Sequence, residues 1–255
     1  MAIVFDGVSY FDELKNINIK VKDRKITGII GPCNSGKSCL VDLISGNFIP
    51  TSGDVFLSDS VGIVYQSVEN QFFYDNIKDE FIFNLKINGV HDVYKKMNDA
   101  VKIVGFNSNI LNKSIYELSL SEQKRISLAI VLAINPKIIV LDDLFFGLDG
   151  YLINKLIRLI RLLKVRYYKT IIVVSNNSDL IHSICDDVIL ISNGTILKSG
   201  DKYEIFTDSK LLKSCNLLMP DVIHFSNMVF KKKNINLGFR DDINDLVKDI
   251  YRFVR

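Results

Sequence analysis

The sequence predicts an α/β fold with a largely parallel sheet. Short runs rich in β-branched residues alternate with helical stretches along the chain, which is the pattern of repeated βαβ units. Several of these runs are nearly all apolar, as expected of strands that helices cover on both faces. The chain has 255 residues, of which 48% are hydrophobic, so it can bury a large core without disulfides or metal ions.

The clearest candidates for buried strands share a short length and an almost wholly apolar sequence. They are Ile26–Ile30, Val61–Tyr65, Ile138–Leu141 and Thr170–Ser175. A hairpin is predicted further along, where Asn193-Gly194 separates two more apolar runs, Val188–Ile191 and Thr195–Lys198. Asn-Gly readily adopts the positive φ angles that a tight turn between antiparallel strands needs.

The middle of the chain is predicted to be a helical insert between strands of the core. Helical periodicity covers Ile77–Ile87, Val93–Val104 and Ser121–Ile134, and Pro136 ends the last of these helices. Beyond Gly200 the pattern becomes short helices again. The last helix, from about Asp242 to Val254, carries an apolar stripe that can pack on its own domain or face a partner. The stripe consists of Ile243, Leu246, Val247, Ile250, Phe253 and Val254.

Composition narrows the classes of function. The net charge of +3 argues against a dedicated DNA-binding protein, which is usually far more basic. The four cysteines include no Cys-x-x-Cys pair, so we expect no zinc site and reduced thiols. No stretch approaches the roughly 18 apolar residues of a membrane span, and the first residues do not resemble an export signal.

A phosphate-binding loop follows the first buried strand and opens a helix. The residues match the pattern G-x-x-x-x-G-K-[ST] in the structural context that this motif requires. Backbone N–H groups and the helix dipole would hold phosphate oxygens, Lys37 would supply positive charge, and the Ser38 hydroxyl could bind Mg²⁺. The predicted nucleotide ligands are Gly31, Pro32, Cys33, Asn34, Ser35, Gly36, Lys37, Ser38 and Cys39.

Asn34 departs from the usual form of such loops, many of which carry glycine at this position. The backbone there takes a conformation that disfavours side chains, and asparagine tolerates a positive φ angle better than most residues. We therefore expect the loop to close with altered nucleotide affinity.

Two acids end a second apolar strand, Ile138–Leu141. Alone, this pattern often marks only a turn. Together with a phosphate loop it predicts that Asp142 holds Mg²⁺, directly or through water, and that Asp143 faces the attacking water.

With these landmarks, the chain resembles the ATP-binding cassette (ABC) ATPases, because the motifs occur in the order of that family. Tyr65-Gln66 stands at the Q-loop, Leu118–Glu122 at the signature, Asp142-Asp143 at Walker B, Gly147–Asp149 at the D-loop and Ser175-Asn176 at the switch. The resemblance implies a P-loop NTPase cassette with a mixed, mainly parallel sheet, an antiparallel β subdomain, a helical subdomain and a short helical C-terminal extension. It also implies ATP and Mg²⁺ as cofactors.

In the resembled family, ATP is hydrolysed at composite sites in a dimer, with the signature supplied by the other chain. The resemblance therefore implies catalytic roles for Asp143, Asn176 and Gln66. It implies Mg²⁺ ligands at Ser38, Gln66 and Asp142, and contacts of Ser119, Ser121 and Glu122 with the partner's nucleotide. Tyr10 or Phe11 could stack on adenine, although core packing explains either aromatic equally well.

A narrower resemblance points to the ATPases of energy-coupling factor (ECF) transporters, which take up vitamins and transition-metal ions. This resemblance rests on two regions of the sequence. They are the Q-loop region, Gln66–Phe72 with Ile77–Glu80, and the tail residues Glu204–Phe206, Leu211-Leu212, Leu218 and Pro220. The resemblance implies an integral-membrane coupling subunit, a substrate-binding membrane subunit, and a peripheral position on the cytoplasmic face of the membrane. It predicts a nucleotide-binding domain over residues 1–207, with a helical subdomain at about 72–136, and a dimerisation extension over residues 208–255.

Four positions depart from the family pattern. Asn34 replaces a loop glycine, the signature reads Leu-Ser-Leu-Ser-Glu, Asp143 replaces a glutamate and Asn176 replaces a histidine. Asp143 is one methylene shorter than glutamate, and Asn176 can neither carry a positive charge nor shuttle a proton. We therefore expect slow hydrolysis at the chain's own site and a heterodimer with an intact ATPase.

Two other functions compete with an importer ATPase. One is a non-catalytic nucleotide-binding subunit that regulates or locks a partner. The other is a cassette protein acting on DNA or ribosomes, suggested by the basic helix Tyr151–Tyr168. A solvated outer face explains that helix better, and the modest net charge disfavours a nucleic-acid partner.

Overall fold

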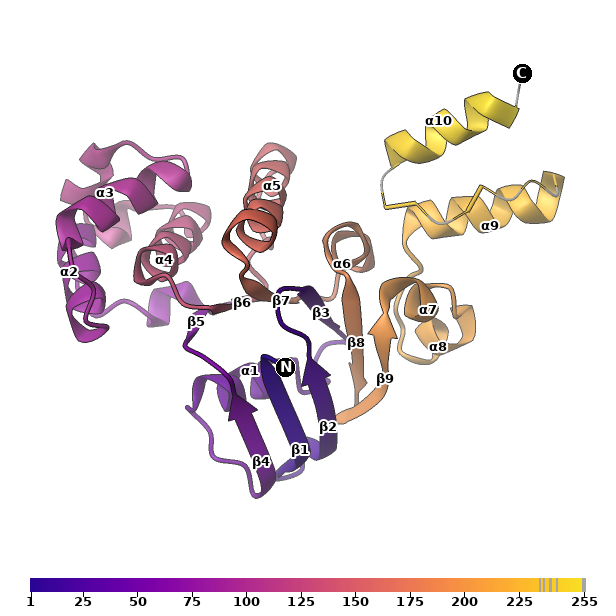
Figure 1. The fold of residues 1–255 in the computed structure, drawn as a ribbon, viewed down its shortest axis with the longest axis horizontal. Helices are drawn as coiled ribbons and strands as arrows, with labels where there is room; N and C mark the ends of the chain where they lie inside the picture. The colour runs from indigo at the N-terminus through magenta and orange to yellow at the C-terminus, as the bar shows by residue number, and fades with distance from the viewer. Residues whose placement is uncertain (234, 236, 239, 242, 254–255) are drawn as a thin grey trace. The chain divides into compact units, whose positions relative to one another are not determined.

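The computed structural model describes residues 1–233, 235, 237–238, 240–241 and 243–253. The chain forms two compact units. The first contains residues Met1–Leu57 and Ile172–Arg255, and the second contains Ser58–Ile171 (Figure 1). Both units contain strands and helices, and the predicted α/β class is confirmed.

The first unit contains a small antiparallel sheet with the strand order β2-β1-β4. Its strands are β1 (Ile3–Tyr10), β2 (Leu14–Val21) and β4 (Ser52–Leu57). Alternate residues of β2 are buried, including Ile17, Ile19 and Val21, as expected of a strand with one covered face. Only three residues separate β1 from β2, and this short connection later forms part of the candidate site.

The second sheet of this unit supports the phosphate loop. Strand β3 (Ile26–Ile30) pairs in parallel with β8 (Asp187–Ser192), and β8 pairs antiparallel with β9 (Thr195–Asp201). Strand β7 (Thr170–Val174), most of which belongs to this unit, lies on the other side of β3. The hairpin between β8 and β9 is confirmed, since Asn193 and Gly194 have φ angles of 48° and 71°. Helices α1 (Lys37–Ser45) and α6 (Ser178–Ile184) follow β3 and β7.

The second unit contains the predicted helical insert. Strands β5 (Val61–Val64) and β6 (Ile138–Asp142) pair in parallel, and the helices between them confirm the sequence prediction to within one residue at each end. They are α2 (Ile77–Ile87), α3 (Val93–Ile103) and α4 (Leu120–Ile134). A Cβ atom at Gly62 of β5 would lie 2.7 Å from a Val131 side-chain atom, so the absence of a side chain lets α4 approach the sheet. Helix α5 (Gly150–Tyr167) follows β6.

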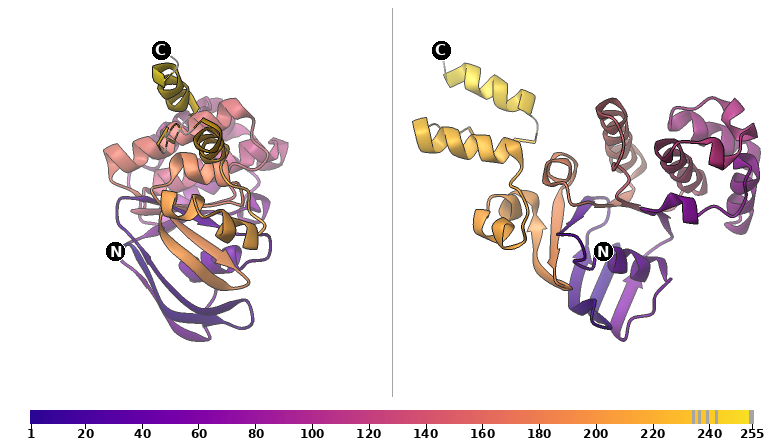
Figure 2. Two further views of the ribbon diagram at one scale, coloured as in Figure 1. Left: turned by 90° about the vertical axis from the view of Figure 1, so that its right-hand side faces the viewer. Right: turned by 180° about the vertical axis from the view of Figure 1, so that it is seen from behind.

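Among the residues that the structure describes, four helices lie in the tail of the chain, within the first unit. They are α7 (Lys202–Phe206), α8 (Ser209–Ser214), α9 (Asp221–Lys233) and α10 (Ile243–Phe253). Helices α9 and α10 lie side by side (Figure 2). Of the stripe predicted on the last helix, Leu246 is buried and Ile250 half-buried, whereas Ile243 and Val247 are exposed. Asp242, Val254 and the side chain of Phe253 lie outside the described residues.

The stripe on α10 is therefore only partly covered. Among the described residues, no helix is long and apolar enough to cross a bilayer.

A buried histidine connects α6 to the start of the tail. His182 is 1% exposed, its ring meets those of Tyr203 and Phe206 edge-on at 5.6 and 5.8 Å, and its Nε2 has no hydrogen-bond partner among the described residues. Burial, aided by the nearby Lys202 ammonium, lowers the pKa of His182 to about 4. The folded protein therefore holds this imidazole neutral at pH values where the unfolded chain protonates it.

This pKa difference predicts an acid-sensitive fold. Above pH 6.5 the imidazole is neutral in both states and contributes nothing. As pH falls from 6.5 to about 4, only the unfolded state gains the proton, so stability falls by an amount on the order of 2 kcal/mol. In His182→Phe, which keeps a ring but cannot titrate, chemical denaturation at pH 7 and pH 4.5 should show a smaller loss of stability. An equal loss in both proteins would refute this assignment.

Candidate nucleotide-binding site

The phosphate loop owes its shape to close packing at two glycines. A Cβ atom at Gly31 would lie 2.1 Å from the carbonyl oxygen of Ile191, and one at Gly36 would lie 2.7 Å from a Leu14 side-chain atom. Gly36 also has a φ angle of 100°, which disfavours any residue with a side chain. Both glycines of the motif are therefore required by the backbone itself.

Asn34 stands where many phosphate loops have glycine, and its backbone is left-handed, as expected. Its φ angle is 58°, a value that asparagine adopts more readily than most residues do. The loop therefore closes without the usual glycine.

Lys37 places its charge against the loop. Its Nζ donates hydrogen bonds to the carbonyl oxygens of Gly31 and Pro32 at 2.9 and 2.6 Å. Helix α1 begins at Lys37, with no acidic residue in its first turn and no side chain accepting a hydrogen bond at its cap. The amide groups and the dipole of this helix end, together with the ammonium group, suit an anion.

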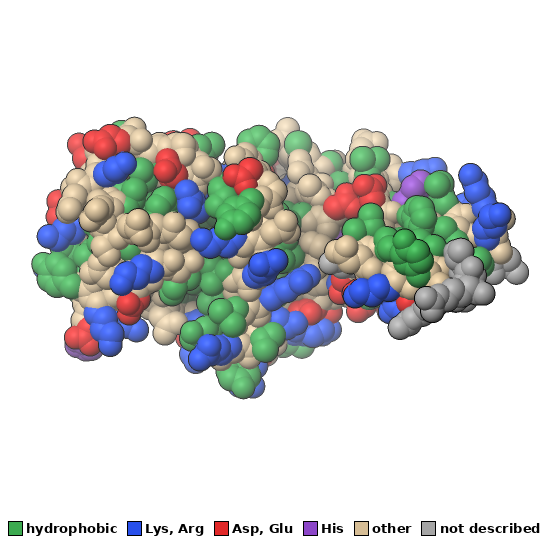
Figure 3. Space-filling model, turned by 90° about the horizontal axis from the view of Figure 1, so that it is seen from above, with side chains coloured by type: hydrophobic (Ala, Val, Ile, Leu, Met, Phe, Trp, Pro, Cys, Tyr) green, Lys and Arg blue, Asp and Glu red, His purple; other side chains and the backbone are tan. Residues whose placement is uncertain are grey.

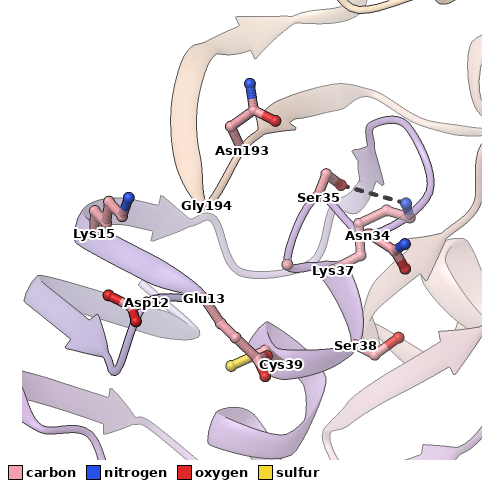
Figure 4. Close-up of a pocket in the computed structure, with 11 residues that line it drawn as sticks. Asp12, Glu13, Lys15, Asn34, Ser35, Lys37, Ser38, Cys39, Asn193 and Gly194 are labelled. Carbon is pink, nitrogen blue, oxygen red and sulfur yellow. Dashed lines mark hydrogen bonds between the residues drawn. The ribbon is translucent and has the colours of Figure 1, made fainter.

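A cavity of about 600 Å³ opens beside the loop (Figure 4). Three segments line it: the β1–β2 connection, the phosphate loop with the start of α1, and the β8–β9 hairpin. Backbone bonds join them, since Gly194 N donates to Ser35 O at 3.1 Å and Lys15 N donates to Gly194 O at 2.8 Å. The lining residues are Asp12, Glu13, Lys15, Asn34, Ser35, Gly36, Lys37, Ser38, Cys39, Asn193 and Gly194.

Five of these lining residues were not predicted from the sequence: Asp12, Glu13, Lys15, Asn193 and Gly194. The Asn-Gly signal predicted the hairpin but not its place beside the loop, which results from packing between distant segments. Glu13 lies near Cys39, and burial together with this carboxylate raises the pKa of the Cys39 thiol to about 12. Cys39 is therefore a neutral, buried thiol at the edge of the cavity.

The two candidate adenine-binding aromatics differ in their surroundings. The Tyr10 ring stacks on Phe48, with centroids 4.7 Å apart and planes at 6°. Phe11 is 72% exposed in the connection that leads directly to Asp12 and Glu13 of the cavity lining. Tyr10 is thus held by internal packing, while Phe11 presents its ring to solvent.

Asn176 lies at the same edge of the sheet as the phosphate loop. Strands β3 and β7 are neighbours, Ser175 N donates to Ile29 O at 3.2 Å, and carboxyl ends of parallel neighbours share an edge. Asn176 is exposed, whereas the next residue, Asn177, caps α6 by accepting a hydrogen bond from Leu180 N at 3.0 Å.

The second unit gathers the predicted acids and the Q-loop glutamine at one sheet edge. Val64 of β5 pairs with Leu141 of β6, so Gln66 and Asp142 follow neighbouring strand ends. Asp142 is 5% exposed. Asp143 has a φ angle of 50°, which shows that the chain turns sharply at the residue predicted to face water.

The signature segment lies at the start of helix α4, where Ser119 is hydrogen-bonded to Glu122 of the same segment. The Glu122 carboxylate accepts hydrogen bonds from Ser119 N at 2.9 Å and Ser119 Oγ at 2.7 Å, and the Ser121 hydroxyl lies 3.2 Å from that of Ser119. These bonds from Ser119 lower the pKa of Glu122, which remains ionised. The exposed Leu120 side chain occupies the position of a signature glycine.

The predicted residues thus fall into two groups. Tyr10, Phe11, the phosphate loop and Asn176 belong to the first unit, while Gln66, the signature and the two acids belong to the second. Within each unit the structure places the predicted residues at strand ends or helix starts.

Comparison with known families agrees with this geometry. Residues 14–145 match the family model described as "ABC transporter", a span that covers more than half of the chain and includes the phosphate loop, the signature and both acids. The chain belongs to the ABC transporter family. It is accordingly an ATPase of this class, as the motif order predicted.

Curated relatives of this ABC ATPase are ECF proteins. The chain is 30% identical over 259 residues to the energy-coupling factor transporter ATP-binding protein EcfA of Methanocaldococcus jannaschii, covering 95% of this chain and 92% of that protein. It is 29% identical to EcfA2 of Mycoplasma capricolum, over 98% of this chain and 95% of that protein. Both the ABC resemblance and its ECF branch are confirmed.

Solved structures confirm the cassette fold. The structure of cbiO1 from Clostridium perfringens, described as part of the ABC transporter complex cbiONQ, is 25% identical and covers 89% of this chain and 98% of that chain, with a TM-score of 0.71. A dimeric ATP-binding cassette bound to ADP and phosphate, 22% identical, has a TM-score of 0.72 over 78% of this chain and 98% of that chain.

The left-handed backbone at Asn34 yields a test of the phosphate loop. Asn34→Gly should keep or improve ATP affinity, because glycine adopts this φ angle freely. Asn34→Val should weaken ATP binding by about tenfold, because a β-branched residue is strained there. Titration with a fluorescent ATP analogue measures both, with the melting temperature as the control for folding. Wild-type affinity in the valine variant would contradict the strain assignment.

Proposed function

We propose that this ABC ATPase is the ATP-binding subunit of an ECF-type importer. It binds Mg-ATP and couples closure of an ATPase dimer, and hydrolysis, to uptake of a vitamin or a metal ion through membrane partners. The observation that carries the proposal is similarity to ECF ATP-binding proteins over almost the whole chain, together with an intact phosphate loop. The chain would then work at the cytoplasmic face of the membrane as a peripheral subunit.

The donor set fits Mg²⁺. Asp142 and Gln66 offer a carboxylate and an amide oxygen at one sheet edge, and Mg²⁺ prefers a few such oxygens completed by water and substrate phosphates. The Ser38 hydroxyl is the further oxygen that the family resemblance implies. When bound, Mg²⁺ would neutralise developing charge on the phosphates. The chain's own task is to hold the triphosphate with Lys37 and the α1 amides.

Hydrolysis at the chain's own site is proposed to be slow. The shorter Asp143 carboxylate would be displaced from the position of a glutamate by more than about 1 Å, a misplacement that can cost around 10²-fold in rate. Asn176 can accept or donate a hydrogen bond but cannot shuttle a proton. A heterodimer with an ATPase that has both groups intact would contain one competent site, completed by Leu118–Glu122 of this chain.

A coupling surface for a membrane partner is proposed beside the Q-loop. Exposed Phe73 and Tyr74 lie in a loop held by the buried Glu80, whose Oε2 accepts hydrogen bonds from both backbone N–H groups at 2.8 and 2.9 Å. Both rings contact Phe83, with centroids 5.3 and 5.2 Å apart. A rigid pair of exposed aromatics suits docking of a helix from a membrane subunit. A separate substrate-binding membrane subunit completes the proposed complex.

Nucleic acid is not a proposed partner. On the face shown in Figure 3, Lys and Arg side chains lie among acidic and apolar ones, and several of them lie near one another in the middle of the view. The proposal rests on the net charge of +3 over the whole sequence, which is small for a nucleic-acid-binding protein.

A second candidate function is a non-catalytic subunit that regulates or locks its partner through ATP-dependent dimerisation. The specific observation favouring it is that both Asp143 and Asn176 depart from the residues needed for fast hydrolysis, while the loop that binds phosphate keeps its essential groups. The two candidates share nucleotide binding and differ in whether this chain's own acid contributes to turnover.

Steady-state ATPase measurements separate these candidates. The pure chain should hydrolyse ATP about 10²-fold more slowly than its complex with an intact partner. Asp143→Glu combined with Asn176→His should change the turnover of the complex only modestly if transport uses the partner's site. Fast hydrolysis by the pure chain, abolished by Asp143→Asn, would refute the asymmetric proposal.

Phe11 is the proposed adenine-stacking residue. Phe11→Ala should weaken ATP binding by about tenfold, since stacking of a base on an aromatic ring is worth about 1–3 kcal/mol, with little change in melting temperature. Tyr10→Ala should instead lower the melting temperature, because its ring packs on Phe48. Calorimetric titration with ATP and thermal unfolding measure the two effects. The reverse pattern would assign adenine to Tyr10.

A further inference from the structure

A buried ammonium group links the signature helix to the turn that carries Asp143. Lys124 lies near the start of α4 and is 1% exposed. Its Nζ donates hydrogen bonds to the carbonyl oxygens of Asp143 at 2.9 Å and Phe146 at 3.0 Å. The same ammonium lies 5.6 Å from the centroid of the Phe146 ring. A single side chain thus binds both ends of the turn between β6 and α5.

Burial of this charge calls for an explanation. It lowers the pKa of Lys124, an effect that Asp143 and Asp142 partly oppose. An apolar residue of similar volume would avoid the desolvation cost, so a buried charge is weak evidence for stability. What Lys124 provides that a methionine could not is a pair of directional hydrogen bonds to two specific carbonyl groups.

Those bonds act on the backbone of the acid itself. Asp143 has a φ angle of 50°, a left-handed conformation that persists in a residue other than glycine only when its surroundings impose it. The turn is closed by a bond from Phe146 N to Asp143 O at 3.2 Å, and Lys124 binds that same carbonyl oxygen. Fixing this peptide group restricts the backbone from which the Asp143 side chain extends.

Helix α4 is tied to the Q-loop as well. Ser127 Oγ donates to Gln71 Oε1 at 3.0 Å, and Tyr65 N donates to the same oxygen at 3.4 Å. Tyr65 directly precedes Gln66. The helix that begins with the signature is therefore bonded to the backbone of the acid through Lys124. It is connected to the backbone next to the Q-loop glutamine through Ser127, by way of the Gln71 side chain.

We propose that Lys124 is a positioning residue. It makes the position of the Asp143 carboxylate depend on the position of the signature helix, α4. In the dimer that the proposed function requires, the signature contacts the partner's nucleotide and Asp143 serves the chain's own. Lys124 would then make the geometry of one composite site depend on the occupancy of the other. This inference rests on the proposed function for the composite sites and goes beyond it by naming the link.

The chain offers a matched control at the other end of the same helix. Lys169 is 5% exposed, and its Nζ donates to the backbone and side-chain oxygens of Asn135, just after α4, at 3.0 and 2.7 Å. Burial lowers its pKa as it does that of Lys124. Lys169→Met removes a comparable buried ammonium with no contact to the signature or the acid.

The first experiment compares the Mg-ATPase of the purified full chain with that of Lys124→Met, Lys124→Arg and Lys169→Met. Lys124→Met should lower kcat about tenfold and leave KM within twofold. Lys124→Arg should recover most of the rate, since guanidinium can also donate to two carbonyls. Lys169→Met should lose a similar amount of stability but keep the wild-type kcat.

A double-mutant cycle tests whether Lys124 acts through Asp143. In an Asp143→Asn background, Lys124→Met should cause no further loss of kcat. An unchanged kcat in Lys124→Met, or an equal loss in Lys169→Met or in the Asp143→Asn background, would overturn the inference.

Sedimentation measurements of Mg-ATP-dependent dimerisation test the role of Lys124 separately from the proposed ATPase function. If the wild-type chain dimerises on Mg-ATP without measurable hydrolysis, its ATPase role fails but the link can still be tested. Lys124→Met should then weaken dimerisation several-fold relative to Lys169→Met, because the signature and the Asp143 turn no longer hold one relative position. Equal dimerisation in the two variants would overturn the link.

Discussion

The close approach of three backbone segments around Gly31, Gly36 and Gly194 is the constraint on which the nucleotide site depends. A Cβ atom at Gly194 would lie 2.2 Å from the carbonyl oxygen of Glu13, as tight as the 2.1 Å approach at Gly31. Contacts this short leave no room for a side chain, so the β1–β2 connection, the phosphate loop and the β8–β9 hairpin are locked together. The cavity beside Lys37 is a consequence of that packing.

Two of the four departures from the family pattern, Asn34 and the signature, lie in segments proposed to bind phosphate, and the other two are Asp143 and Asn176. Binding needs backbone amides, a helix end and one cation, and all of these are present because Asn34 adopts the left-handed backbone at a φ angle of 58°. In the proposed function, Asp143 and Asn176 stand where hydrolysis needs a carboxylate of the right reach and a group that can carry a proton. On that proposal these two departures affect turnover, whereas Asn34 preserves the shape of the phosphate loop.

Much of this arrangement is local and could be predicted from the sequence. The strand, loop and helix around Lys37, the insert helices and the hairpin all follow from periodicity and turn chemistry. The contributions of Asp12, Glu13, Lys15 and Asn193 to the cavity could not be predicted, because each depends on packing between segments far apart in the sequence. The same holds for Lys124, whose place in the motif suggests an ordinary basic helix residue, and for the partial exposure of the α10 stripe.

Two helix ends in this chain treat negative charge in opposite ways. At α1 no acidic side chain occupies the first turn, so its amides and dipole remain suited to a phosphate group. At α4 the ionised Glu122 already accepts hydrogen bonds from Ser119 N and Oγ, so part of the favourable field is used within the chain. A phosphate approaching this signature must compete with that carboxylate for the Ser119 hydroxyl. In the proposed dimer, the signature would therefore bind a partner's nucleotide only in competition with Glu122, whereas the first turn of α1 holds no acidic side chain.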